Sequence, residues 1–242
     1  MTNPSLATRA APVTRSAPRG GIDLLLAAAV LAVAAAMARA AWFTPVEAFQ
    51  GPAQKIFYVH VPSAITALYV AFPLLGISSA LYLWLRDERV DRMAESAAEV
   101  GLVFMTVVLV TGPLWGKPIW GTWWTWDARL TLTLFEWLIV LGYLTLRNAL
   151  EDPGQRARYT AVIGMLALLL VPFIHLSTTL FPTLHPAPVL IKPSAPSMPR
   201  EMVTTWLWAQ GAFLLLFAAL LRGRYRLATE RGLLSQLRGG EP

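Results

Sequence analysis

Residues 159–180 read YTAVIGMLALLLVPFIHLSTTL, a stretch without Asp, Glu, Lys or Arg. An α-helix rises about 1.5 Å per residue, so about 20 apolar residues cross the roughly 30 Å hydrocarbon layer of a membrane. An unpaired backbone amide is costly inside that layer, and a helix pairs its amides within the segment. This stretch therefore predicts a membrane-spanning helix.

Five further stretches have the same apolar character. The six predicted spans are residues 22–43, 59–85, 97–114, 130–146, 159–180 and 203–221. The composition agrees, since 56% of the residues are hydrophobic and only 14% are charged, whereas a soluble domain has about 25% charged residues. We expect an all-α, polytopic membrane protein with six transmembrane helices.

The segments between these spans differ in charge. The N-terminal arm, the loops after spans two and four and the C-terminal tail hold fourteen of the 20 Lys and Arg residues. Cytoplasmic segments carry such an excess, so both termini are predicted to be cytoplasmic in a bacterial inner membrane. The net charge of +6 then belongs to the inner surface, where its partner is membrane lipid and not nucleic acid.

Three segments follow along the chain. Residues 1–21, rich in Ala, Pro, Ser, Thr and Arg, are expected to form a disordered cytoplasmic arm. Residues 22–221 form the membrane domain, and residues 222–242 a basic cytoplasmic tail that is disordered beyond residue 237. The chain has no cysteine, which excludes disulfides, thiolate metal sites and covalent thioether attachment of haem.

One predicted outer segment is unusually rich in tryptophan. Residues 115–129 read WGKPIWGTWWTWDAR, and five of the ten tryptophans of the chain lie within twelve residues of it. They are Trp115, Trp120, Trp123, Trp124 and Trp126. Tryptophan is enriched at membrane interfaces, but a cluster of this density predicts a platform for a flat apolar ring system. Asp127 either caps the next helix or contacts a ligand.

All three histidines fall in the predicted outer half of the chain. His175 lies inside a span, where a hydrogen-bonded packing role is the favoured interpretation. His60 and His185 lie at the outer ends of their segments, next to the tryptophan-rich segment. Two imidazoles without a third ligand make a poor zinc site. They make a good axial pair for a metal whose equatorial positions are already filled.

Haem satisfies these requirements together, because it is a flat apolar ring that carries iron and two carboxylates. We therefore predict non-covalently bound haem b, with His60 and His185 as iron ligands facing the tryptophans. Lys117, Arg129 and Arg200 are the candidate partners of the propionates, and spacing alone does not choose among them.

The same residues resemble a known family. The run from Trp115 to Arg129 is similar to the tryptophan-rich WWD signature of bacterial haem-handling proteins. The motif Tyr58-x-His60-Val-Pro62-x-Ala64 resembles the histidine motif of the haem exporter protein C branch. That branch also carries Thr-Leu-His, kept here at residues 183–185, but with a flanking tryptophan pair that this chain replaces.

The resemblance implies a task in cytochrome c maturation. His60 and His185 would be the axial ligands, and the tryptophan-rich segment with Lys117, Asp127 and Arg129 would form the outer haem platform. The protein would present haem to the periplasmic haem chaperone. Its other implied partners are the ATPase and permease subunits of an ABC transporter and a small single-span subunit.

The main alternative is a transporter, or an ABC-exporter permease subunit, that moves another solute. Its candidate residues are Glu136 and Glu99, because carboxylates inside a membrane span call for a functional explanation. The sequence lacks the paired broken helices of inverted repeats. It also contains no nucleotide-binding, metalloprotease or nucleophile motif, so we predict that the protein is not an enzyme.

Overall fold

The computed structural model describes residues 23–186 and 198–239, with side chains described as far as residue 234, and this part of the chain is helical. Six helical stretches are long and apolar enough to cross a membrane. They are Leu24–Phe43, Pro52–Leu85, Glu88–Trp120, Ala128–Ala149, Pro153–Leu180 and Arg200–Leu234. The all-α class and the six predicted spans are therefore confirmed.

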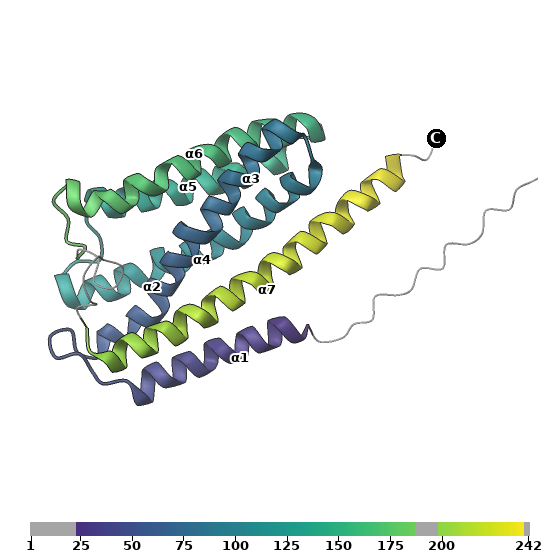
Figure 1. Cartoon of the computed structure of the whole chain (residues 1–242). Helices are drawn as coiled ribbons and strands as arrows, with labels where there is room; N and C mark the ends of the chain where they lie inside the picture. Colours follow the sequence, from purple (N-terminus) through teal and green to yellow (C-terminus); the bar gives the residue numbers. More distant parts are fainter. Residues whose placement is uncertain (1–22, 187–197, 240–242) are drawn as a thin grey trace, which may run out of the picture.

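The spans run antiparallel in a single bundle (Figure 1). The main helices are α1 (Leu24–Ala38), α2 (Phe57–Thr66), α3 (Phe72–Leu85), α4 (Glu88–Trp120), α5 (Ala128–Ala149), α6 (Pro153–Leu180) and α7 (Arg200–Gly239). Two π-helical turns, η1 (Arg39–Phe43) and η3 (Ala67–Ala71), extend α1 and join α2 to α3. A 3₁₀ turn, η2 (Pro52–Ile56), leads into α2.

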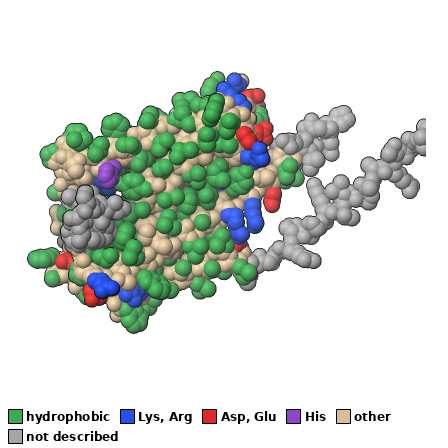
Figure 2. Space-filling view, viewed as in Figure 1, with side chains coloured by type: hydrophobic (Ala, Val, Ile, Leu, Met, Phe, Trp, Pro, Cys, Tyr) green, Lys and Arg blue, Asp and Glu red, His purple; other side chains and the backbone are tan. Residues whose placement is uncertain are grey.

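Both ends of the described chain lie at one end of the bundle (Figure 1). We call this the ion-pair end, because Arg147, Arg222 and Arg224 form salt bridges there. The other end holds the start of α2, the end of α4 and the turn 121–127, and we call it the histidine end. In Figure 2, hydrophobic side chains cover the surface between the two ends.

Aspartates begin four of the helices. Asp23, Asp87, Asp127 and Asp152 are the N-caps of α1, α4, α5 and α6, and each side chain accepts from first-turn amides. These amides have no partner within the helix, so a capping carboxylate satisfies them and also meets the positive end of the helix dipole. Each aspartate therefore marks where a span starts.

Most of the helices are longer than hydropathy predicts, and two of them continue far past their predicted last residue. α4 continues past residue 114 to Trp120, so the first part of the predicted tryptophan-rich loop is helical. α7 continues past residue 221 to Gly239, two residues beyond the point where order was expected to end. Hydropathy detects the edge of the apolar layer, whereas a helix can continue through polar residues. The predicted arm 1–21 and the last residues of the tail, 240–242, lie outside the described residues.

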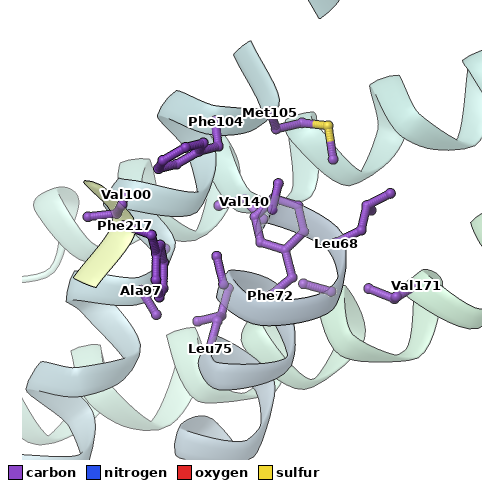
Figure 3. Close-up of a cluster of buried hydrophobic side chains, with 14 of the residues drawn as sticks. Leu68, Phe72, Leu75, Ala97, Val100, Phe104, Met105, Val140, Val171 and Phe217 are labelled. Carbon is purple, nitrogen blue, oxygen red and sulfur yellow. The ribbon is translucent and has the colours of Figure 1, made fainter. Parts of the chain in front are cut away.

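The core joins α3, α4, α5, α6 and α7. Figure 3 shows Phe72 and Leu75 of α3 among Phe104, Val140 and Phe217 from neighbouring helices. Two glycines bring α3 and α6 together, because a Cβ on Gly76 or Gly164 would lie 2.2 Å from an atom of the opposite helix. Such close approach is the usual means by which membrane helices gain packing contacts.

Candidate functional site

The structure brings His60 and His185 together at the histidine end. His60 lies in the first turns of α2, and His185 follows α6, far away along the chain. Their rings are close enough to interact electrostatically with each other, and the guanidinium of Arg129, at the start of α5, acts on both. Three elements therefore converge on one place, which helical periodicity alone did not specify.

The ring of His60 is held by α4. Its Nδ1 lies 2.9 Å from the hydroxyl oxygen of Thr111, and that hydroxyl donates its only hydrogen to the carbonyl of Val107 at 2.7 Å. The imidazole must therefore donate from Nδ1, which leaves the lone pair of Nε2 available. Gly112 gives the ring room, because a Cβ there would lie 3.4 Å from the Cε1 of His60.

His185 is arranged in the same way. Its Nδ1 lies 3.2 Å from the carbonyl oxygen of Pro186, which can only accept, so Nδ1 carries the proton and Nε2 is free. Burial, together with the nearby charge of Arg129, lowers the pKa of His185 to about 4. The imidazole is therefore neutral at physiological pH, which is the form that binds a metal.

The five tryptophans do not form one loop or one flat shelf. Trp115 and Trp120 lie on the last turns of α4 and face the two histidines, with ring centroids 5.7 Å from His60 and 6.5 Å from His185. Gly121, with φ of 75°, ends the helix in the left-handed conformation that glycine favours. The other three tryptophans lie on the turn after it, where Trp123 and Trp126 are exposed.

The turn 121–127 contains one polar group that bears on ligand binding, the indole nitrogen of Trp124. Trp124 is half-buried, with its ring 5.8 Å from that of Trp126, and its Nε1 has no hydrogen-bond partner among the described residues. A buried donor without a partner is uncommon in native proteins and suits a site that takes up a further polar group.

Asp127 is the N-cap of α5, and this is one of the two roles that the sequence suggested for it. One carboxylate oxygen accepts from the amide of Leu130 at 3.0 Å, and the other accepts from Thr125 at 3.1 Å and from the amide of Leu184 at 3.4 Å. Burial acts to raise the pKa of Asp127, but these hydrogen bonds outweigh it and lower the pKa. The same carboxylate thus links α5 to the segment that carries His185.

The three candidate cations differ in position. Arg129 is partly buried and donates to the carbonyl of Ile174 at 3.3 Å, close to both histidines. Lys117 is exposed, donates to the carbonyl of Gly121 at 2.9 Å and lies 6.0 Å from the ring of Trp123. Arg200 is exposed at the first residue of α7. Of the three, Arg129 is the one that acts on both imidazoles.

Three other residues at this end were not identified from the sequence. Thr111 holds His60, Gln50 accepts from the indole nitrogen of Trp115 at 3.0 Å, and Tyr69 bonds to His175 at 2.7 Å. Thr111 lies four residues before Trp115, so both belong to one face of α4. Because α4 was predicted to end at residue 114, that shared face was not visible in the sequence.

His175 is the exception among the histidines. It was expected to pack between helices, but its side chain is exposed on the side of the bundle, with a hydrogen bond to Tyr69. Its position on α6, one residue after Ile174, turns it away from the buried face of that helix.

We expect Thr111→Val to weaken haem binding by about 10- to 100-fold, the usual effect of losing the residue that orients a metal-binding histidine. Valine has nearly the same shape but cannot accept from His60, so the ring loses its fixed tautomer and orientation. Haem titration of the purified variant, followed by absorbance, measures the change. Thr145→Val, an exposed threonine on α5 that bonds only to its own helix, is the matched control. Equal affinity of the two variants would contradict the role of Thr111.

The donor set fits haem better than a bare metal ion. Among the described residues, no three His, Cys, Asp or Glu side chains come together to hold a metal. Two neutral imidazoles with free Nε2 atoms suit iron whose other four ligands are supplied by a porphyrin. The neighbouring tryptophans offer apolar rings for the macrocycle, and Arg129 offers a cation for a propionate.

A bundle of six membrane spans with this site belongs to the class of multi-pass membrane proteins that handle haem. The sequence profile described as CcmC, heme exporter protein C, matches residues 8–235, and the chain belongs to this family. Membership implies haem delivery for cytochrome c maturation in the bacterial membrane, and it makes the protein a haem-handling component and not an enzyme.

Relatives support the assignment over most of the chain. The chain is 35% identical over 196 residues to heme exporter protein C of Bradyrhizobium diazoefficiens, which covers 81% of this chain and 74% of the relative. It is 32% identical over 184 residues to heme exporter protein C of Escherichia coli, covering 76% and 74% of the two chains. With the protein of that name from Rhodobacter capsulatus it shares 40% identity over 139 residues, or 57% of each chain.

Proposed function

We propose that the protein binds haem b non-covalently at the histidine end, with the Nε2 atoms of His60 and His185 as axial ligands. It presents this haem to the periplasmic haem chaperone for cytochrome c maturation. The observation that carries the proposal is that the two imidazoles are held alike: in each the Nδ1 donates to an oxygen acceptor, which leaves the Nε2 unprotonated. Haem here is the cargo, so its binding must remain reversible.

The surrounding residues supply the other contacts. Trp115 and Trp120 pack beside the two ligands, while Trp123, Trp124 and Trp126 offer ring faces on the turn. Arg129 pairs with one propionate because its charge acts on both imidazoles, and exposed Lys117 is available to the other. Asp127 links the start of α5, which carries Arg129, to the segment that carries His185.

The exposed rings also favour transfer to a partner. Trp123 and Trp126 are 56% and 76% exposed, and aromatic side chains of this kind are enriched in protein interfaces. We place the histidine end on the periplasmic side, with both termini cytoplasmic, and we take the ABC transporter subunits as further partners. The small single-span subunit binds within the membrane.

One of the two carboxylates considered for the transporter alternative has a structural role in the bundle. Glu99 forms a salt bridge with Arg224 and is therefore a packing element at the ion-pair end. Glu136 is fully buried, and both carboxylate oxygens lack a hydrogen-bond partner among the described residues. One isolated carboxyl group does not make a pathway across the membrane, so we favour haem presentation over transport of another solute.

An absorption spectrum tests the proposal. We expect the protein, purified in detergent and mixed with haem, to show the sharp Soret band of low-spin iron with two axial imidazoles. Extraction with acidified acetone should then remove all of the pigment as haem b, because no covalent bond holds it. Protein that stays colourless after haem addition, or that holds only high-spin haem, would contradict the proposal.

The tryptophans of the turn should affect the rate at which haem is lost more than they affect the ligation of its iron. An aromatic contact contributes about 0.5 to 1.5 kcal/mol beyond burial, so we expect Trp123→Ala and Trp124→Ala to speed the loss of haem to apomyoglobin by about 2- to 12-fold each. The spectrum of the bound haem should keep its low-spin shape. Trp84→Ala, an 80% exposed tryptophan at the ion-pair end, is the control, and equal loss rates for all three variants would exclude stacking on the turn.

A further inference from the structure

A polar pair lies on the side of the bundle, next to the site. The hydroxyl of Tyr69, in the π-helical turn η3, is 2.7 Å from the Nδ1 of His175 on α6. Their rings meet edge to face, with centroids 5.9 Å apart. Tyr69 is 40% exposed and His175 is exposed as well, so the pair faces outward from the bundle and not into its core.

The surface around this pair is apolar. Phe173 and Leu176, two positions before and one position after His175 on α6, are 61% and 46% exposed, and hydrophobic side chains cover the surface between the two ends of the bundle (Figure 2). Lipid covers a surface of this kind in a span. An imidazole and a phenol that face lipid lose hydration, so they are expected there only where they meet a polar group.

Both helices are irregular at this point. η3 departs from α-helical geometry over Ala67–Ala71, and this places Tyr69 outward while Leu68 and Ala71 remain buried. On α6, Pro172 lies inside the helix, three residues before His175. Single π-helical turns are frequent at functional sites, and a proline leaves a backbone carbonyl without its helical partner.

Arg129 connects the pair with the iron-ligand site. Its guanidinium donates to the carbonyl of Ile174, the residue before His175, at 3.3 Å. It also acts electrostatically on Tyr69, and on His60 and His185 beyond it. A polar route thus leads from the lipid-facing surface, through one cation, to the two imidazoles.

We propose that Tyr69 and His175 form a lateral access site that takes up the carboxylate end of haem from the outer leaflet and passes it to Arg129. The inference rests on the proposed function and adds the route by which cargo arrives. One hydrogen of the pair is used in the bond between the phenol and the imidazole, which leaves one hydrogen, on the Tyr69 hydroxyl or on the Nε2 of His175, to donate to a carboxylate. The pair lies where an amphiphile dissolved in lipid would present its polar end. A lipid phosphate offers the same acceptor chemistry, so the test separates the two.

The test measures the rate of loading and the final spectrum independently. Haem is added to haem-free protein in phosphatidylcholine nanodiscs, and the Soret band is followed over time. We expect Tyr69→Phe and His175→Leu to slow loading by about tenfold, as the loss of one hydrogen bond to a charged group would. The final spectrum and amplitude stay unchanged because the iron ligands are untouched. Tyr159→Phe, an exposed tyrosine at the other end of α6, is the matched control.

Haem dimethyl ester, which lacks free carboxylates, identifies the group recognised. We expect wild-type protein to load the ester as slowly as the variants load haem, and the variants to show no further slowing. Unchanged loading of haem in both variants would overturn the inference, and so would equal slowing for haem and its ester. Equal slowing of haem and its ester would assign the pair to lipid phosphate instead. A wild-type protein without any Soret band would refute the proposed function itself.

Discussion

His60→Ala and His185→Ala are each expected to abolish the low-spin spectrum of bound haem. Either change leaves iron with one protein ligand, so the Soret band shifts to the high-spin position and affinity falls by at least about 100-fold, beyond the loss expected for an orienting residue. The two imidazoles come from different elements and share no hydrogen bond, so the losses should combine, and the double variant should bind no haem. Spectral titration in detergent measures all three proteins.

Free imidazole provides the control for this prediction. Each single variant has lost only a ligand, so millimolar imidazole should restore the low-spin spectrum in His60→Ala and in His185→Ala, but not in the double variant at the same haem concentration. Unchanged thermal unfolding of the variants shows that the bundle is intact. A low-spin spectrum that survives either single substitution without added imidazole would remove that histidine from the ligand set.

The spans were predictable because a membrane imposes one simple requirement. Stretches such as residues 159–180 must be apolar over the thickness of the layer and helical throughout, and both properties are visible in the sequence. The capping role of Asp127 was also among the interpretations, since it precedes an apolar run. The length of α4 was not predictable in this way, because Pro113 and Pro118 suggest a break, yet the helix continues through both to Trp120.

The site was predictable in its residue types but not in its connections. His60, His185 and the tryptophans stand out in composition and position, whereas the partner of His60 is a threonine on another span. Nothing local in the sequence distinguishes Thr111 from the other threonines of the spans. The same holds for Arg129 against Lys117: both are cations next to tryptophan, and only the packing of α5 against α6 turns Arg129 toward the imidazoles. Contacts between spans depend on helix rotation, which apolar stretches such as these leave undetermined.

The second large effect concerns a buried ion-pair cluster at the other end of the bundle. The side chain of Arg147 on α5 is 5% exposed and donates to both carboxylate oxygens of Asp91 on α4, at 2.9 and 2.5 Å. It also contacts Glu95 at 3.1 Å and Thr160 of α6 at 3.4 Å. Removing one partner of a buried pair leaves a charge without compensation, which costs about 3 to 5 kcal/mol. We therefore expect Arg147→Met, which leaves two carboxylates without their cation, to lower the free energy of unfolding by about that amount, measured by denaturant unfolding in detergent. Asp91→Leu should lower it by less, because Glu95 still pairs with Arg147.

The double variant Arg147→Met/Asp91→Leu separates the cost of an unpaired charge from the value of the pair. Replacing a whole buried pair by apolar residues is often neutral or stabilising, so we expect the double variant to recover most of the lost stability. The remaining deficit comes from Glu95, whose side chain is 24% exposed and hydrated in part. Arg89→Ala, which removes the exposed pair with Asp87 on the same helix, should change stability little. If the double variant is as unstable as the single variants, then the cluster holds α4, α5 and α6 together through direct attraction and not through the avoidance of a buried charge.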